Sequence, residues 1–454
     1  MTLAFDDIQG IALRGYGEKR HAAYALVRFA DPVAARGWLA RVDVTAATDC
    51  RRPGHPGEDD RRARRRAEPL AVNVALSAAG LRALGYADRA VLSRAFWAGM
   101  AADRARRATG DPAPDQWEWS DARVHAVVLA FAATAEAVDR ALADLRAERG
   151  LTVVRVLPTV DLGGVEHFGF RDGISQPRLV PAPGERGDPP GEFVFGYPDA
   201  RGRVDGRADI RCNGSYLVFR QLRQDVRAWW AAMARFAPPL PGRGDGDARV
   251  WLASKLVGRW PSGAPLAFAP DVDPGAGAVP ADGFGYRDDP DGLRCPVGAH
   301  IRRTHPRDGL FGDTAEQARR VTERHRILRR GRPYGPPTGL SAADMARRPE
   351  AIDGADRGLH FLCLNADLVR QFEFVQQTWA NNGKFGGLAD DPDPLVGRWP
   401  RRHATVPRDP VRLRLVGLPE VTELRGGGYF FLPGVRALRA IAAGADLAAP
   451  PGPV

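Results

Sequence analysis

The sequence predicts an α+β protein made of two ferredoxin-like modules, and two observations support this fold class. Between residues 21 and 157, short apolar segments alternate with helix-like segments of about a dozen residues, in the order β-α-β-α and then β-α-β. The same alternation returns in the second half of the chain, where longer loops separate the segments. We therefore expect two modules whose sheets pack together in a dimeric α+β barrel-like arrangement.

The first module is expected to cover residues 1–157. Short apolar runs bounded by turn residues are its strand candidates: residues 21–30, 70–76, 124–132 and 151–157. Its helix candidates are the segments between these runs: residues 31–42, a helix that begins at residue 77, and residues 134–150. Ser77 is the expected N-cap of the second helix, and Gly150 is expected to end the third. The polar and basic residues 50–69 are interpreted as a loop insertion.

Residues 158–210 are rich in Gly, Pro and Asp and are expected to connect the modules, so that residues 211–454 form the second one. The apolar runs of this second module are its strand candidates: residues 215–222, 358–365 and 428–432. Its helix candidates lie at residues 225–236, 249–260, 367–379 and 435–443. A long loop is expected over residues 261–294, because this stretch is again dense in Pro, Gly and Asp.

The net charge of +10 and the pI near 9.9 come mostly from arginine. These arginines are scattered along the chain instead of lying along one segment, which argues against a nucleic-acid-binding protein. The densest run, residues 61–66, follows the acidic residues 58–60. We interpret it as a solvated loop, with nucleic-acid contact as the alternative.

Four cysteines lie far apart without a CxxC pair, which predicts free thiols in a reducing compartment: Cys50, Cys212, Cys295 and Cys363. No stretch approaches the roughly 20 apolar residues of a membrane span. The first ten residues lack the basic and apolar regions of an export signal. The sequence therefore favours a cytoplasmic protein that does not enter a membrane.

An acidic residue lies between glycines in residues 166–177, which read Glu-His-Phe-Gly-Phe-Arg-Asp-Gly-Ile-Ser-Gln-Pro. Glycine allows a tight turn and the close approach of another group, so Asp172 can face a molecule bound in an apolar pocket. A carboxylate in that place is able to transfer protons. The alternative is a loop aspartate that caps a turn, which is common for Asp-Gly pairs.

Two later segments carry further candidate residues. His300 follows small residues that leave room for a large planar group, and neutral imidazole is a common iron ligand. Arg329 ends a short apolar segment, where a permanent positive charge at the edge of a core can stabilise a developing anionic oxygen. The alternatives are a surface histidine in a basic loop and a surface basic cluster.

These three segments together resemble the dye-decolorizing peroxidase family. They read Gly-x-x-Asp-Gly-Ile-Ser-Gln-Pro from residue 169, Ala-His-Ile-Arg-Arg from residue 299 and Ile-Leu-Arg-Arg-Gly-x-Pro-Tyr from residue 327. Further matching segments extend the resemblance over nearly the whole chain: residues 7–10, 213–221 and 370–376. The long loops resemble those of the larger subclasses of this family.

The resemblance implies that haem b is the cofactor and lies in the second module, with His300 as the axial iron ligand. His305 is the second candidate for this ligand. Asp393 is expected to accept the other ring N–H of His300, which makes the imidazole more electron-donating, and Asp391 is the alternative acceptor. Ordinary turn chemistry is the competing interpretation of both aspartates.

The resemblance also implies a peroxidase that uses hydrogen peroxide to oxidise phenolic or dye-like organic donors. Asp172 is expected to move a proton between the two peroxide oxygens, and Arg329 to stabilise negative charge during O–O cleavage. The remaining expected haem contacts come from backbone near Asp172 and from one aromatic ring on the distal side: Gly173, Ile174, Ser175 and Phe361.

A haem pocket is too small for bulky dyes, so oxidation at a surface tryptophan or tyrosine is a second expected route. Three of the ten tryptophans are instead expected in the core: Trp230, Trp251 and Trp379. The alternative function is a haem- or iron-handling protein of the same fold whose peroxidase activity is incidental, and a haemless binding module is a third. The physiological donor and the oligomeric state are left open.

Overall fold

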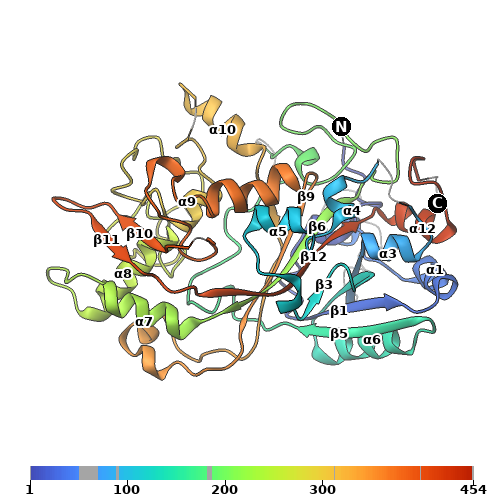
Figure 1. The fold of residues 1–454 in the computed structure, drawn as a ribbon, viewed down its shortest axis with the longest axis horizontal. Coiled ribbons are helices and arrows are strands. Elements are labelled where there is room, and N and C mark those ends of the chain that lie inside the picture. The colour runs from blue at the N-terminus through green and yellow to red at the C-terminus, as the bar shows by residue number, and fades with distance from the viewer. Residues whose placement is uncertain are drawn as a thin grey trace.

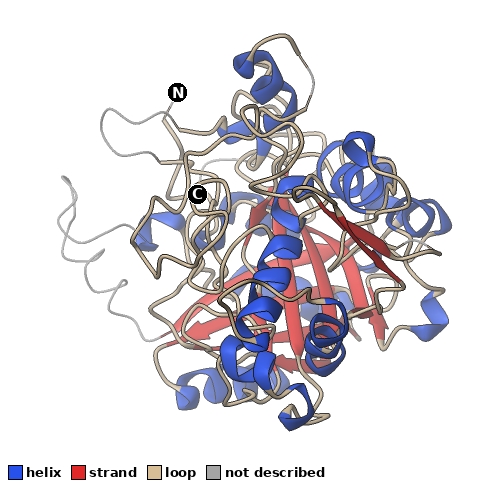
Figure 2. Ribbon diagram, turned by 90° about the vertical axis from the view of Figure 1, so that its left-hand side faces the viewer, coloured by secondary structure: helices blue, strands red, loops and turns tan. Residues whose placement is uncertain are grey.

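The computed structural model describes residues 2–50, 70–87, 91–180, 187–310, 312–398 and 400–451. The basic run at residues 61–66 lies outside these ranges. Within them, most strands belong to one ten-stranded sheet, and a separate two-stranded hairpin lies at one end of the molecule (Figure 1). Figure 2 shows helices crossing in front of this sheet.

The first half of the chain contributes four antiparallel strands, in the spatial order β5-β1-β4-β2: β1 (His21–Phe29), β2 (Leu70–Ser77), β4 (Ala126–Ala132) and β5 (Leu151–Pro158). Helix α1 (Pro32–Arg41) follows β1, and α6 (Ala135–Ala147) connects β4 to β5. Both helices have side-chain N-caps, from Asp31 and Thr134. In this order the fourth strand lies beside the first and the third beside the second, as in a ferredoxin-like module.

A long connection between β2 and β4 holds short elements: α3 (Ala78–Ala83), α4 (Arg94–Ala98), α5 (Asp103–Thr109) and β3 (Trp119–Ser120). Ser77 caps α3 as predicted, because its hydroxyl accepts a hydrogen bond from the Gly80 N–H at 2.9 Å. A Cβ on Gly80 would lie 2.0 Å from the His125 carbonyl oxygen. Glycine is therefore needed at this position so that α3 can pack against the start of β4.

The second half repeats the order as β12-β6-β9-β7, with a second strand that is broken in two: β6 (Ser215–Gln224), β7 (Leu328–Arg329), β8 (Arg332–Tyr334), β9 (Gly358–Asn365) and β12 (Thr422–Leu432). Both β7 and β8 pair with β9. Helix α7 (Val226–Phe236) follows β6, and two π-helical segments, η6 (Val369–Glu373) and η7 (Val375–Ala380), follow β9. The second half is thus also ferredoxin-like in strand order.

Strand β12 joins the two halves into one sheet. It pairs along its length with β6, and near its end Phe430 and Phe431 lie opposite Ser77 and Leu76 of β2. In Figure 1 it runs as the long red strand through the middle of the molecule. The predicted α+β barrel-like class is confirmed.

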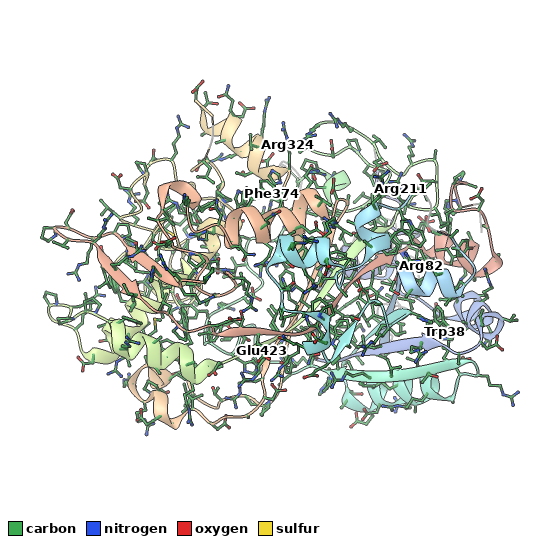
Figure 3. All side chains as sticks on the ribbon, viewed as in Figure 1. Trp38, Arg82, Arg211, Arg324, Phe374 and Glu423 are labelled. Carbon is green, nitrogen blue, oxygen red and sulfur yellow. The ribbon has the colours of Figure 1, made fainter. Side chains whose placement is uncertain are left out.

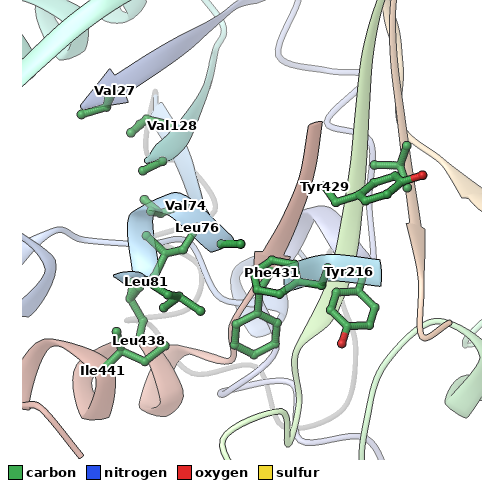
Figure 4. Close-up of a cluster of buried hydrophobic side chains, with 14 of the residues drawn as sticks. Val27, Val74, Leu76, Leu81, Val128, Tyr216, Tyr429, Phe431, Leu438 and Ile441 are labelled. Atoms are coloured by element: carbon green, nitrogen blue, oxygen red, sulfur yellow. The ribbon is translucent and has the colours of Figure 1, made fainter. Parts of the chain in front are cut away.

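Two large clusters of buried apolar side chains hold the sheet and the helices around it in place. One packs α12 (Val435–Ala443) through Leu438 and Ile441 against Val74, Leu76 and Leu81, as Figure 4 shows. The other surrounds α7 and α8 (Asp245–Val257) and includes several tryptophans. The tryptophans expected in the core are buried there or near it: Trp230, Trp251 and Trp379.

Several predicted boundaries differ from the structure. The helix expected at 249–260 is α8, which begins at Asp245 and ends at Val257, because the C-cap Gly258 has a φ of 96°. Strand β12 begins at Thr422 instead of 428, since pairing with β6 carries its glycine-rich part into the sheet. Further elements lie outside every predicted strand, helix and loop: α9 (His300–Thr304), α10 (Ala315–Glu323), α11 (Ala342–Arg347), β10 (His403–Val406) and β11 (Leu413–Val416).

Short 3-10 turns complete the described structure: η1 (Gly10–Ala12), η2 (Ala47–Cys50), η3 (Pro114–Gln116), η4 (Pro190–Glu192), η5 (Pro349–Ala351) and η8 (Phe385–Gly387). Three cysteines are described with their side chains and all are free thiols, as predicted: Cys212, Cys295 and Cys363. In the described ranges, none of the helices combines the length and apolar character that crossing a membrane requires.

Candidate active site

A cavity of about 260 Å³ lies between the second-half sheet, the loop at residues 166–175, α9 and the π-helical segments. Apolar and aromatic side chains from β9 and η6, including Phe361 and Phe372, make up much of its wall. The predicted site residues that line it come from four separate parts of the chain: Asp172, Ile174, Ser175, His300, Arg329 and Phe361. Such an apolar cavity with a few convergent polar groups is the usual form of a ligand site.

Asp172 is held by the tight loop that the glycines predicted. Its own N–H donates to the Gly164 carbonyl at 3.0 Å, and Gly173 follows with φ of 78°. A Cβ on Gly173 would meet nothing within 4 Å, so the positive φ and not crowding requires glycine there. Ile174 and Ser175 line the cavity beyond it, whereas Gly173 contributes its N–H to the Asp172 carboxylate.

Arg329 reaches the same loop from β7. Its Nη1 donates to Asp172 Oδ1 at 2.7 Å and its Nη2 to the Ile174 carbonyl at 3.1 Å. Its backbone N–H donates to Gln176 Oε1 at 3.0 Å. About a third of each side chain of the ion pair is exposed, 35% for Arg329 and 36% for Asp172, and this exposed part faces the cavity. The pair is thus half-buried and open to a molecule bound in the cavity.

The charge state of Asp172 follows from two opposing effects. Burial raises the pKa of its carboxyl, but the charge and hydrogen bond of Arg329, together with smaller contributions from the Gly173 N–H and from His300, lower it by more. The resulting pKa lies below the ordinary value for aspartate. Asp172 is therefore ionised and able to accept a proton even in mild acid.

His300 begins the short helix α9, and its ring is tied to a buried carboxylate. Its Nδ1 lies 2.9 Å from Asp393 Oδ2, while the Asp393 side chain is fully buried. The other oxygen, Oδ1, accepts from the N–H groups of Leu395 and Val396 at 2.9 Å each. Burial raises the pKa of Asp393, but His300, the Val396 N–H and the charge of Arg303 together outweigh it, so that the net pKa is lowered. An ionised Asp393 fixes the Nδ1–H tautomer and leaves Nε2 free toward the cavity.

The rival residues have other surroundings. Asp391, the alternative acceptor, pairs with Arg414. His305 lines the cavity, and burial, with Arg326 and Arg307 nearby, lowers its pKa well below the ordinary value.

A third histidine, His325, also lines the cavity, but its ring is engaged elsewhere. The ring stacks on Phe374, labelled in Figure 3, at 3.8 Å between centroids. Its Nδ1 lies against the Arg370 carbonyl. Among the described residues, the bond to a buried carboxylate singles out His300.

Arginines gather at the part of the cavity near Ser175. The Ser175 hydroxyl accepts from Arg259 at 2.9 Å and from Arg307 at 3.2 Å. Arg307 also pairs with Asp282, whereas the described bonds of Arg259 go to carbonyls and to this hydroxyl and not to a carboxylate. Burial lowers the pKa of Arg259 to about 10, which still leaves it charged. A buried guanidinium of this kind suits an anionic group in the cavity.

Arg259 and Glu166 are among the cavity residues for which the sequence predicts no role. Arg259 lies at the end of a predicted helix, and only the fold brings it to Ser175. Glu166 opens the stretch that contains Asp172, and its position there was the only available signal. Both line the same cavity as Asp172.

Comparison with known proteins identifies the family. Residues 7–160 match the family model described as the DyP dimeric alpha+beta barrel domain. The dye-decolorizing peroxidase msp1 of Mycetinis scorodonius is 32% identical over 402 residues, covering 82% of this chain and 76% of the relative. The chain belongs to the dye-decolorizing peroxidase family. The multifunctional dye peroxidase DyP2 of Amycolatopsis sp. is another similar dye peroxidase, 33% identical over 404 residues, covering 82% of this chain and 83% of the relative.

Solved structures of dye-decolorizing peroxidases share the fold over the whole molecule. A dye-decolorizing peroxidase in complex with 2,6-dimethoxyphenol superposes with a TM-score of 0.80 at 29% identity, covering 97% of this chain and 100% of the other. This likeness includes the second half, which holds the cavity. As a member of the dye-decolorizing peroxidase family, the chain is a haem peroxidase.

Proposed function

We propose that this haem peroxidase uses haem b and hydrogen peroxide to oxidise phenolic or dye-like donors. The observation that carries the proposal is the convergence of two contacts on one cavity, Asp172 with Arg329 and His300 with Asp393. In this proposal His300 is the axial iron ligand, Asp172 the acid/base and Arg329 the residue that stabilises negative charge.

The residues around the cavity fit a haem group. When bound, haem supplies the iron that takes up peroxide and the redox equivalents for oxidising the donor. The free Nε2 of His300 would hold the iron, and Asp393 would keep the imidazole electron-donating through its Nδ1–H. Arg259 and Arg307 would bind the carboxylates of the porphyrin, since Arg259 has a buried charge that no described carboxylate neutralises.

Asp172 and Arg329 would act together on peroxide. Because its pKa is lowered, Asp172 is ionised and takes the proton from one peroxide oxygen, then returns a proton to the other, which leaves as water. Arg329 stabilises the negative charge that develops as the O–O bond breaks. Ile174, Ser175 and Phe361 would enclose this side of the cavity and keep out bulk water.

The proposed donors follow from the relatives and from the cavity wall. One relative is named a multifunctional dye peroxidase, and one solved structure holds 2,6-dimethoxyphenol. Aromatic side chains around the cavity, such as Phe361 and Phe372, suit a small phenol. Bulky dyes would react at a surface aromatic residue instead.

The proposed division of the chain assigns haem to the second module, residues 211–454. Strands β6 and β9, helix α9 and the π-helical segments all belong to it. The connecting region, residues 158–210, would supply Asp172, and residues 1–157 would form the first module.

The test compares Asp172→Asn with the unchanged protein, each purified with haem supplied. We expect the same Soret band in both, and at least a hundredfold slower change of that band on mixing with peroxide in the variant, as the loss of a general acid/base group predicts. Asp161→Asn, an exposed aspartate of the same connecting region, is the control and should react at the normal rate. An unchanged rate in Asp172→Asn would contradict the acid/base role, and stoichiometric haem or iron transfer without turnover would favour the haem-handling alternative.

A further inference from the structure

A second carboxyl group, that of Glu166, lies on the wall of the same cavity as Asp172. Its Oε2 accepts from the Phe168 N–H at 2.9 Å and from Gln224 Nε2 at 2.7 Å, and its Oε1 accepts from the Phe170 N–H at 3.0 Å. Its backbone N–H and carbonyl also bond within this turn, to Phe170 and Gly169. Glu166 therefore holds the loop that presents Asp172, and all three donors to its carboxylate are neutral.

The surroundings of the two carboxyls differ in charge. On its own loop Glu166 is close to His167, which burial keeps neutral and whose Nε2 lies against the Tyr334 carbonyl, and to the exposed Arg171. The guanidinium of Arg329 is engaged by Asp172 and not by Glu166. Other elements bring further charged or titratable groups to the cavity: Arg220 from β6, His300 from α9, His305 and Arg307 after α9, Arg259 after α8, His325 and Arg326 after α10, and Arg398 after η7.

Burial, with a smaller contribution from the negative charge of Asp172 and partly offset by the three neutral donors, raises the pKa of Glu166 to about 7. The pKa of Asp172 is shifted the other way, below its ordinary value. Two carboxyls in one cavity with opposite shifts have different protonation states near neutrality.

We propose that Glu166 is a second proton-holding group of the peroxide-side cavity, a positioning residue whose protonation leaves Asp172 ionised in acid. The inference rests on the proposed function of Asp172. The proton comes from solvent and neutralises Glu166, which removes its repulsion of the Asp172 charge. Above neutrality Glu166 is ionised, and its negative charge opposes the negative charge that Arg329 stabilises during O–O cleavage. The reaction with peroxide is therefore slower in alkali than in acid.

The first measurement is the pH profile of the Soret change on mixing haem-loaded enzyme with peroxide. We expect the rate of the unchanged enzyme to fall about tenfold as pH rises through about 7, the effect of one pK unit of coupling. Glu166→Gln should show no such fall. Gln224→Leu removes a donor that stabilises the ionised carboxylate, so the fall should move to higher pH. Glu136→Gln, an exposed glutamate of α6, is the control and should keep the fall in place.

The second measurement does not use turnover. The infrared difference spectrum of the resting haem-loaded enzyme between about pH 5 and about pH 9 should contain the carbonyl bands of protonated carboxyls, among them Asp121, whose pKa burial raises to about 6, and Glu166→Gln should lack the one band that belongs to Glu166. The proposal would be overturned if the rate of Glu166→Gln still fell as the pH rises through about 7. It would also be overturned if this variant were slower by the same factor at every pH and kept the infrared band. If Glu166→Gln does not bind haem, Gln224→Leu is the deciding variant. The proposal is refuted if the rate of Gln224→Leu falls at the same pH as the rate of the unchanged enzyme. Absence of any peroxide reaction in the unchanged enzyme would instead refute the proposed function, and the infrared band would still report on Glu166.

Discussion

Replacing Arg329 with leucine should change the pH dependence of the peroxide reaction and not only its rate. Arg329 is the main reason that the pKa of Asp172 lies below its ordinary value, because burial alone acts in the opposite direction. In Arg329→Leu the effect of burial is unopposed, so the pKa of Asp172 rises. In acid the carboxyl is then protonated and can no longer accept the proton of peroxide.

The size of this effect follows from the contact. An opposite charge within hydrogen-bond distance lowers a carboxyl pKa by about 1–3 units. About a third of each side chain is exposed to the cavity, so we take the lower end, about one unit. One unit makes the ionised fraction up to about tenfold smaller, and the full factor applies where the pH lies below both the original and the new pKa. Loss of the guanidinium from the transition state adds a pH-independent loss of about 10²-fold.

The assay is the second-order rate of the Soret change with peroxide, measured from about pH 3 to about pH 8. The rate of Arg329→Leu, divided by that of the unchanged enzyme, should rise about tenfold from the acid end to the neutral end of this range. Arg329→Lys keeps the positive charge and is the control, for which this ratio should change less. A ratio that is constant over the whole range would refute the reasoning, because it would show that Arg329 does not set the pKa of Asp172.

Two further predictions concern the proximal side. His300→Ala should lose most of its haem on gel filtration, whereas His305→Ala should keep it; retention of a normal histidine-ligated spectrum in His300→Ala would move the ligand elsewhere. Asp393→Asn should weaken haem binding about 10–100-fold and raise the iron reduction potential, since the imidazole loses its anionic partner; spectroelectrochemical titration measures the potential, and Asp390→Asn in the same turn should leave it unchanged.

The local sequence pattern predicts the bounds of a helix or strand correctly where particular residues mark both of its ends. Strand β9 and helix α12 have the predicted bounds, because an apolar run in one case and flanking glycines in the other mark where each begins and ends. The first part of β12 could not be predicted in this way. Its three consecutive glycines, residues 426–428, are typical of a loop, and pairing with β6 on one side and β3 on the other makes them a strand.

The candidate site could be predicted in part for the same reason. Asp172, His300 and Arg329 lie in short motifs, so sequence alone singled them out. The contact between His300 and Asp393 joins residues 93 positions apart, and the sequence offered two aspartates for it. The raised pKa of Glu166 depends on burial, and no local sequence pattern shows that this side chain is buried. The burial arises in a cavity that forms only when distant elements meet.

The first module does not contain the cavity, but it helps to fix the position of Arg329. Two neighbouring arginines bind backbone carbonyls of the first module, Arg330 through Nε to Ile11 at 2.8 Å, and Arg332 to Lys19 at 2.8 Å and Tyr16 at 2.6 Å. On its other side β7 pairs with β9 in a fixed register. A shift by one residue would point the guanidinium away from Asp172 and break these bonds together. The 2.7 Å contact on which the proposed chemistry depends is therefore held from both halves of the chain.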